Sequence, residues 1–392
     1  MRKIGLDLGA RHIAYCEVSD DGKVVDRVSV KSFEELRSCL GPDTEPATVA
    51  FEACREAWVV YDTLAGWGHD PRMLDTTRIR QLGVGQHGRK TDSIDAEMIA
   101  VAVAENRIKE AHVLSPERRQ LRAHLSVRAA LVETRAQYIT TIRGLARAAG
   151  VLLPTCAPSS FVSKIEEWTL DGATRALVAP LLATLKTLET ELEPVEKTLS
   201  EIAEKDPAMQ LCATVPGVGL IVAATFVSVV DEAKRFHNAH AVGAYLGLVP
   251  AESTTGGPNK RRLGSITKQG NRVARAMLIQ AAWTIYRLRD ENDPLKRWVT
   301  HVAKTRNKHV AVVGLARKLS GVLWAIWRDG AVYDPKQHAE KAARGVEVAA
   351  GRQLDRAKAL QRSATKLRRP LKAKTKVSAL TTPRKTSKRS AM

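Results

Sequence analysis

The chain lacks the features that mark membrane, secreted and zinc-binding proteins. Its longest apolar stretch, Leu220–Val230, covers 11 residues, whereas a transmembrane helix needs about 20. Its five cysteines are odd in number, widely spaced and never arranged as Cys-x-x-Cys, which argues against a disulfide framework and a zinc site. The N-terminus reaches Asp7 before an apolar segment of signal-peptide length can form, so no secretory leader is expected. These absences predict a cytoplasmic protein without a membrane span.

Acidic residues are scarce beside basic ones, and the imbalance is local. The 392 residues include 62 Lys+Arg and 42 Asp+Glu, a formal net charge of +20. Residues 356–392 contain 13 Lys+Arg and no acid; their polar composition without apolar periodicity predicts a disordered arm that neutralises phosphates, with a solubilising tail as the alternative. Eight more Lys+Arg and no acid lie between Glu252 and Asp290, inside folded sequence. This second stretch predicts a phosphate-binding surface, with a solvated basic face as the alternative.

The N-terminal part has the pattern of an α/β domain. Strand-like runs come first, around the turn Ser19–Gly22, in Lys3–Leu8, His12–Val18 and Lys23–Val30. Helices and strands then alternate, with a helix Ser32–Leu40, a strand Ala47–Phe51, a helix Trp58–Trp67 and a short strand at Met73-Leu74. A glycine-rich connection, Gly83–Gly88, precedes a helix that carries Asp92 and Asp95. An antiparallel meander followed by alternating elements predicts one α/β domain.

A long helical region is expected next. Ser115-Pro116-Glu117 is a helix-start signal and Gly150 a natural stop, and residues 151–173 are expected to form a loop. An apolar seam with alternating spacings of four and three residues follows, formed by Leu181, Leu185, Leu188, Leu192, Val195, Leu199 and Ile202. This spacing predicts a coiled coil, which either joins copies of the chain in a homo-oligomer or folds back as a hairpin within one chain. Pro194 lies inside the seam and is expected to kink or divide the helix.

The rest of the chain is predicted to be mainly α-helical. Thr214–Leu220, with the sequence TVPGVGL, precedes an apolar helix and is typical of a helix-hairpin-helix, although an ordinary helix connection would also fit. Further helices are expected at Ala241–Leu248, Asn271–Arg289 and Lys308–Trp327, the last of them in the core. The predicted divisions are an α/β domain at 1–110, a helical and coiled-coil region at 111–206, a C-terminal domain at 207–335 and a basic tail at 336–392.

Four acids stand where a strand ends or a helix begins: Asp7, Glu52, Asp92 and Asp95. The i, i+3 spacing of the two aspartates places both on one helix face. In a ribonuclease H-like sheet, adjacent first and fourth strands would bring Asp7 and Glu52 side by side beneath that helix. Four such carboxylates repel one another unless a divalent cation lies between them, and hard oxygen ligands favour Mg²⁺. Together the acids predict a metal site for phosphoryl transfer on DNA, whereas each alone would be a solvated or capping residue.

Several motifs together resemble a known family. They are GLDLG at 5–9, FEAC at 51–54, KTDSIDAEMIA at 90–100, VPGVG at 215–219, and YLGLVP with KRRLGSITKQGN between 245 and 271. The combination resembles the DEDD transposases of bacterial insertion sequences, the Piv-like recombinases, some of which are guided by a bridge RNA. The resemblance covers about residues 1–335. It implies a RuvC-like domain that holds the DEDD acids Asp7, Glu52, Asp92 and Asp95, then a coiled coil and a C-terminal transposase domain that contributes a serine nucleophile.

The nucleophile is where the sequence departs from this family. The family's serine lies just before a glycine, beyond the Leu-Val-Pro segment, and Thr255 occupies that place here. Thr255 can attack through its hydroxyl but is β-branched and more crowded than serine. Ser253, on what is expected to be a flexible glycine-flanked loop, is the alternative. Attack by water at the metals, an impaired protein and an ordinary Gly-Pro turn are the remaining interpretations.

The resulting prediction is an insertion-sequence transposase that cuts and rejoins DNA through a transient protein–DNA phosphoester, assisted by Mg²⁺. Its expected partners are the element ends and target DNA, a guide RNA and further copies of the chain. A junction-resolving nuclease or an invertase without guide RNA is one alternative, and a basic, non-catalytic nucleic-acid-binding protein is another. The predicted phosphate contacts are the backbone N–H groups of Gly217 and Gly219 and the side chains of Lys260, Arg261, Arg262, Lys268 and Arg272.

Overall fold

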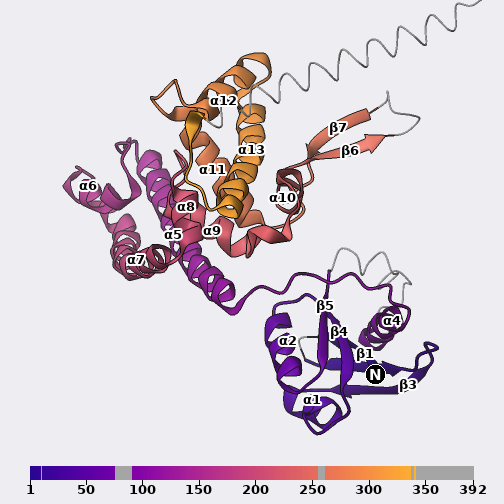
Figure 1. Cartoon of the computed structure of the whole chain (residues 1–392). Coiled ribbons are helices and arrows are strands. Elements are labelled where there is room, and N and C mark those ends of the chain that lie inside the picture. Colours follow the sequence, from indigo (N-terminus) through magenta and orange to yellow (C-terminus); the bar gives the residue numbers. More distant parts are fainter. Residues whose placement is uncertain (10, 76–90, 255–260, 337–339, 341–392) are drawn as a thin grey trace, which may run out of the picture. The chain divides into compact units, whose positions relative to one another are not determined.

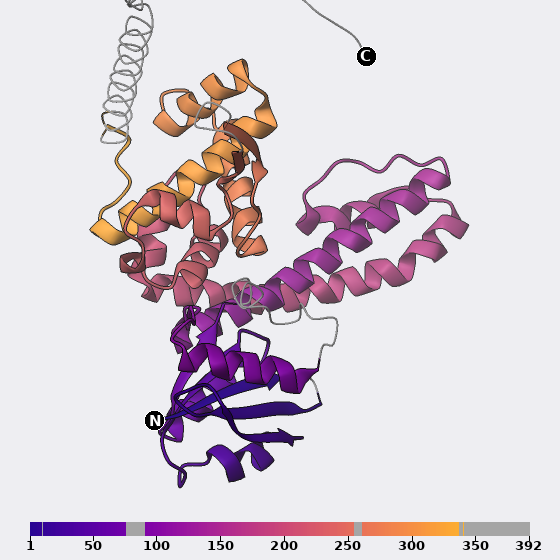
Figure 2. The same cartoon turned by 90° about the vertical axis from the view of Figure 1, so that its right-hand side faces the viewer.

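The computed structural model describes residues 1–9, 11–75, 91–254, 261–336 and 340 (Figures 1 and 2). The chain divides into two compact units, the first ending at Leu188 and the second beginning at Glu189. The division falls inside one helix, α7 (Gly172–Lys205). The predicted connection Gly83–Gly88 and most of the basic tail lie outside the described residues.

The first unit opens with a mixed sheet whose strands are β1 (Arg2–Leu8), β2 (Ile13–Val18), β3 (Val24–Val30), β4 (Ala47–Glu52) and β5 (Asp70–Leu74). Among the described residues the strand order is β3-β2-β1-β4-β5. β1, β2 and β3 pair antiparallel, while β4 pairs parallel with both β1 and β5. The strands lie where the sequence predicts them, and the central position of β1 next to β4 is the arrangement that the ribonuclease H-like prediction required.

Helices cover both faces of this sheet (Figure 1). On one face, α1 (Phe33–Leu40) and α2 (Ala57–Gly66) pack with the buried side chains of β1 and β4, such as Leu6 and Phe51. On the other face, α4 (Asp92–Ala104) buries its alanines against Cys16 and its neighbours in β2. Burial on this face raises the pKa of the Cys16 thiol. The alternation of side chains along each strand therefore separates two apolar layers.

A helical hairpin completes the first unit. α5 (Pro116–Ala148) and the first part of α7 lie side by side (Figure 2). They share an apolar cluster in which Leu181, Leu185 and Leu188 pack with Ile142 of α5. This stretch of the predicted seam is thus used within the chain, as the fold-back alternative expected, and pairing between copies stays a prediction. The prediction of a loop at 151–173 was wrong in part. This segment contains a 3-10 turn (Pro158–Ser160) and a short helix, α6 (Phe161–Glu167). Phe161 of α6 is fully buried in the same apolar cluster.

Pro194 does not divide the seam helix. α7 runs without interruption from Gly172 to Lys205. A proline inside a helix loses one backbone hydrogen bond, but Leu192 and Leu199 on either side of it are buried at 4% and 0% exposure. Tertiary packing on both sides outweighs the local cost, so of the two expected effects, a kink or a division, the division was wrong.

The second unit is mainly helical, with α8 (Pro207–Ala213), α9 (Leu220–Val230), α10 (Ala239–Tyr245), α11 (Arg272–Arg287), α12 (Pro294–Thr305) and α13 (Lys308–Asp329). Helix α12 was not anticipated from the sequence, although Asp293 caps it and Pro294 occupies its first turn. A two-stranded antiparallel ribbon, β6 (Pro250–Thr254) and β7 (Arg261–Ile266), precedes α11. The strand β6 includes Ser253, so the expectation of a flexible loop at that residue was wrong.

Helix α13 lies in the core of the second unit. By length and composition alone it would be able to cross a membrane, although no membrane span was predicted from the sequence. Leu315, Leu319 and Leu323 on it are fully buried, and it packs against α10, α11 and α12. This packing is that of a core helix, as the sequence predicted for Lys308–Trp327.

Candidate active site at the carboxyl edge of the mixed sheet

Asp7 and Glu52 stand at corresponding places on neighbouring strands. In the parallel pair β1 and β4, Leu6 is opposite Phe51. Asp7 and Glu52 are the next residues along each strand, and both strands end there or one residue later. Parallel strands bring their carboxyl ends to one edge of a sheet, so the backbone places both acids at that edge.

Both acids lie on the face of the sheet that α4 covers. Side chains alternate along a strand, so Asp7 shares the face of Gly5, and Glu52 that of Ala50. Gly5 lies against the α4 backbone, since a β-carbon there would come within 2.6 Å of the backbone nitrogen of Ala100. Ala50 packs in one buried cluster with Ile99. Helix α4, which carries Asp92 and Asp95, therefore covers the face on which the backbone places Asp7 and Glu52.

Helix α4 runs back along β1, with its acidic first turn at the carboxyl end of the strand. A β-carbon on Gly9, just past β1, would lie 3.6 Å from Asp92 Oδ2, whereas one on Gly5 would overlap the carbonyl oxygen of Ala96. Asp7 lies between the two glycines on the strand, and Asp95 lies between Asp92 and Ala96 on the helix. The first turn of α4 is thereby aligned with the end of β1.

Asp95 and Asp92 differ in their surroundings. Asp95 is 5% exposed, and within the described ranges its carboxylate has no hydrogen-bond or ion-pair partner. Asp92 is exposed. A carboxylate with so little exposure to water is costly unless it meets a cation, and four carboxylates are a donor set that suits a hard divalent ion. The residue types therefore fit a metal, although among the described side chains no three His, Cys, Asp or Glu gather closely enough to form a ligand cluster.

One of the two candidate nucleophiles, Ser253, belongs to the ribbon of the second unit. Ser253 is exposed on β6, opposite Arg262 of β7. Thr255 and Lys260 lie outside the described residues. The backbone of Arg261 opens β7, opposite Thr254. The ribbon therefore holds Ser253 on a defined strand next to a basic residue.

Of the other predicted basic contacts, Arg262 belongs to β7 of the ribbon, and Lys268 and Arg272 lie just beyond it. Arg262, Lys268 and Arg272 are all exposed. Lys268 has a left-handed backbone with φ 57° and donates its N–H to the carbonyl of Gly247 at 3.1 Å. Arg272 is the first residue of α11, whose N-cap Asn271 accepts from the N–H of Ala274. A positive surface at a helix N-terminus is suited to phosphate.

The two glycines of the predicted hairpin have different roles. Gly217 has φ +78°, and a β-carbon on it would come within 2.7 Å of Ile285 Cγ1 on α11. Gly219 is the N-cap of α9 with φ −84°, and nothing lies within 4 Å of its missing β-carbon. A cavity of about 550 Å³ lies against both glycines, between α8, α9 and α11. Gly217 is thus required by the turn, while Gly219 borders open space.

Sequence analysis did not single out Gly5 or Gly9. Both belong to the GLDLG motif. Gly5, two residues before Asp7, occupies the same face of β1 as the acid, and Gly9 follows directly after the strand ends. Glycine inside a strand signals a close backbone approach, and this signal was available from the sequence.

Comparisons with known proteins agree with the motifs. A model of the DEDD transposases, described as "Transposase", matches residues 4–149, and one described as "Transposase IS116/IS110/IS902 family" matches residues 209–296. A "Probable family 20 transposase" of Pseudomonas aeruginosa is 28% identical over 86% of this chain and 99% of its own length. The transposase for insertion sequence element IS1111A of Coxiella burnetii is 27% identical over 82% and 88%. The corresponding protein of IS1328 in Yersinia enterocolitica is 26% identical over 84% and 98%.

Proposed function

Because the chain belongs to the DEDD transposases of insertion sequences, we propose that it moves its own element by a metal-dependent exchange of DNA strands. The observation that carries this proposal is the alignment of β1, β4 and the first turn of α4. The proposed metal ligands are the four carboxylates at that edge, Asp7, Glu52, Asp92 and Asp95.

Mg²⁺ is the proposed ion. Carboxylate oxygens are the ligands that Mg²⁺ prefers, and when bound it would stabilise charge on the phosphoryl oxygens during transfer. The burial of Asp95 beside apolar α4 residues supports a fixed ligand, whereas the exposed Asp92 has room to adjust.

The proposed nucleophile is the hydroxyl of Thr255, with Ser253 as the alternative. Its oxygen attacks a DNA phosphorus, a bond to one DNA oxygen breaks, and that strand leaves with a free hydroxyl. The hydroxyl of a second strand then attacks the protein–DNA phosphoester and restores the side chain. Each step exchanges one phosphoester for another, so no external energy source is needed.

The proposed nucleic-acid contacts are the exposed basic residues of the second unit together with the turn that contains Gly217 and Gly219. We propose DNA ends and target DNA as substrates, a guide RNA as a partner, and more than one copy of the chain at the synapse. Purification from cells that carry the complete element tests the RNA: one discrete species from sequence beside the gene supports guidance, and a diffuse mixture argues for direct DNA recognition.

The metal-site proposal is tested with Asp95→Asn and a matched control, Glu105→Gln, at the exposed end of the same helix. Strand cleavage and joining of an element-end substrate are followed in the presence and absence of Mg²⁺. We expect Asp95→Asn to lose both reactions and Glu105→Gln to retain them. Full activity of Asp95→Asn would remove the aspartate from the mechanism.

A junction-resolving nuclease or invertase, with water as the nucleophile, is the second candidate. The threonine at position 255 in place of a serine favours it. A denaturing gel separates the candidates, because protein-linked DNA forms only when a side chain attacks.

A further inference from the structure

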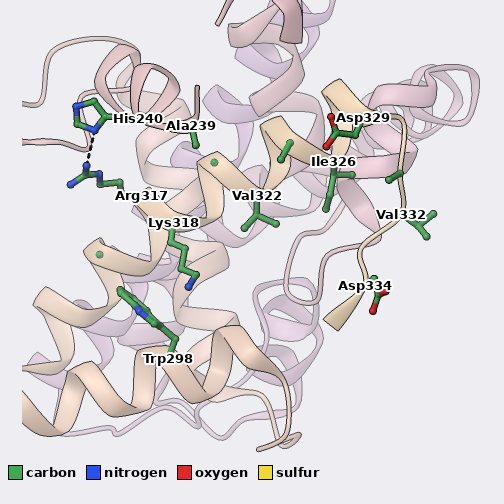
Figure 3. Close-up of a pocket in the computed structure, with 14 residues that line it drawn as sticks. Ala239, His240, Trp298, Arg317, Lys318, Val322, Ile326, Asp329, Val332 and Asp334 are labelled. Atoms are coloured by element: carbon green, nitrogen blue, oxygen red, sulfur yellow. Dashed lines mark hydrogen bonds between the residues drawn. The ribbon is translucent and has the colours of Figure 1, made fainter. Parts of the chain in front are cut away.

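A cavity of about 670 Å³ runs along α13 in the second unit, away from the ribbon and from the turn at Gly217. It is bordered by α10 on one side and α12 on the other (Figure 3). Glycines of α13 let the bordering helices approach it closely. Gly321 lies against Ala239 so closely that a β-carbon would come within 2.8 Å, and one on Gly314 would come within 3.2 Å of Trp298. The volume lies in the range of small-molecule sites.

One end of the cavity gathers nitrogen-bearing side chains. Arg317 Nη2 lies 2.8 Å from His240 Nδ1, and Lys318 Nζ lies 5.2 Å from the ring centroid of Trp298. A guanidinium can only donate, so Nδ1 of His240 accepts and its Nε2–H remains a donor. This end therefore offers two positive charges and an additional N–H group.

Among the residues that the structure describes, these two charges have no acidic partner. Within the described part of the chain, neither Arg317 nor Lys318 forms an ion pair with a carboxylate. Burial lowers the pKa of the Lys318 ammonium, with no opposing contribution from an acid. Half-buried cations without counter-charge are stabilised by a bound anion, and phosphate accepts from all three donors.

The lining of the cavity changes from charged to apolar side chains along α13. Val322 and Ile326 follow Lys318 at intervals of four residues, on the same face of α13, and both line the cavity (Figure 3). Lys318 and Ile326 are about 12 Å apart at the α-helical rise, which one nucleotide spans from its phosphate to the far edge of its base. Asp329 stands one turn further on and disfavours a second phosphate along the groove.

We propose that this cavity binds a single unpaired nucleotide of the nucleic acid on which the protein acts, with its phosphate at Arg317, Lys318 and His240 and its base against Val322 and Ile326. The inference rests on the proposed function for the identity of the polymer. A duplex is too wide for the cavity, so the nucleotide belongs to a single strand or is turned out of a helix.

The test is photo-crosslinking of the full-length protein to short single-stranded DNA and RNA carrying 5-iodouracil, followed by peptide mapping. We expect a crosslink within residues 298–326, and Lys318→Gln should weaken it about tenfold, the equivalent of one lost charge-assisted hydrogen bond. Lys308→Gln, at the exposed start of the same helix, is the matched control and should bind like the wild type. A stronger crosslink with DNA identifies an element or target strand, and one with RNA identifies a guide.

A competition experiment distinguishes binding of a nucleotide from binding of an anion alone. Adenosine monophosphate should displace the oligonucleotide from the cavity at lower concentration than inorganic phosphate, and Ala325→Leu, which fills the apolar part, should abolish that difference. Equal competition by inorganic phosphate, or crosslinks confined to other peptides, would overturn the proposal. Strand cleavage is measured in parallel to distinguish this proposal from the proposed function. Cleavage without this crosslink refutes nucleotide binding in the cavity, and the crosslink without any cleavage refutes the proposed reaction.

Discussion

Gly5 of β1 and Ala96 of α4 approach so closely that a β-carbon on the glycine would overlap the alanine carbonyl oxygen. The same β-carbon would lie 2.6 Å from the backbone nitrogen of Ala100. Neither atom belongs to a side chain that can rotate away. Strand and helix therefore meet backbone to backbone, two residues before Asp7, and this contact sets the height of Asp92 and Asp95 above the sheet.

Gly5→Ala is expected to push α4 away from β1. Overpacking of this kind costs about 1–3 kcal/mol in the free energy of unfolding, and Mg²⁺-dependent cleavage should fall more than stability because the acids separate. Urea unfolding and a cleavage assay measure the two effects. Gly66→Ala, where nothing lies within 4 Å of the added carbon, is the control and should change neither. Unchanged cleavage by Gly5→Ala would show that the helix height does not matter.

Gly217→Ala and Gly219→Ala form a second matched pair. The first substitution meets Ile285 and a left-handed backbone, so it should destabilise the second unit by about 1–3 kcal/mol. The second meets open space and keeps its N–H, so stability and DNA affinity should stay within the error of the wild type. Thermal unfolding and filter binding provide the measurements. Equal effects of the two substitutions would contradict the assigned roles.

Glu17 links stability to pH through Arg2. Arg2 Nη2 donates to Glu17 Oε2 at 2.7 Å, and the Tyr15 hydroxyl donates to the same oxygen at 2.6 Å. The hydrogen bond from Arg2, followed by that from Tyr15, holds the pKa of Glu17 below its ordinary value of 4.5. A lowered folded-state pKa gives stability that is present above the ordinary pKa and is lost as pH falls through the folded one.

Glu17→Gln should therefore destabilise the first unit at pH 7, by about 1.5–3 kcal/mol for hydrogen bonds to a charged group. Below pH 4.5 the difference from the wild type should shrink, because Glu17 itself becomes protonated. Urea unfolding at pH 7 and pH 3 measures both values. A difference that is constant with pH would exclude the ionised carboxylate as its source.

Thr255→Ala should abolish protein-linked DNA, while Ser253→Ala should leave most of it, if the proposed order of nucleophiles is correct. Thr255→Ser keeps the hydroxyl with less crowding and should react at least as fast as the wild type. The covalent product is measured on a denaturing gel. Loss of the product with Ser253→Ala alone would assign the role to the residue on β6. Persistence of the product in the double variant would mean that another side chain attacks, and strand cleavage without any protein-linked DNA would identify water as the nucleophile.

Local patterns sufficed for most elements of the fold. Strand-like runs and turn residues placed β1 to β4, a helix was expected at Ser32–Leu40 where α1 lies, and Asp92 and Asp95 were expected on one helix, where both occupy the first turn of α4. These features depend on side-chain periodicity and on neighbours a few residues away, which the sequence states directly. Helix α12 carried a comparable signal at Asp293-Pro294 that sequence analysis passed over.

Distant contacts decided the rest. The apolar spacing around Leu185 would be the same whether α7 packed against another chain or against α5, so the spacing alone does not identify the partner. The continuity of α7 through Pro194 depends on the burial of Leu192 and Leu199. The ribbon that holds Ser253 forms by pairing with Arg262, nine residues away across the connection. The sequence by itself determined which residues could form the acidic set and the basic surface. The tertiary structure alone decided how closely α4 approaches Gly5 and that α10, α12 and α13 enclose a cavity, because backbone separation between elements follows from packing over the whole unit.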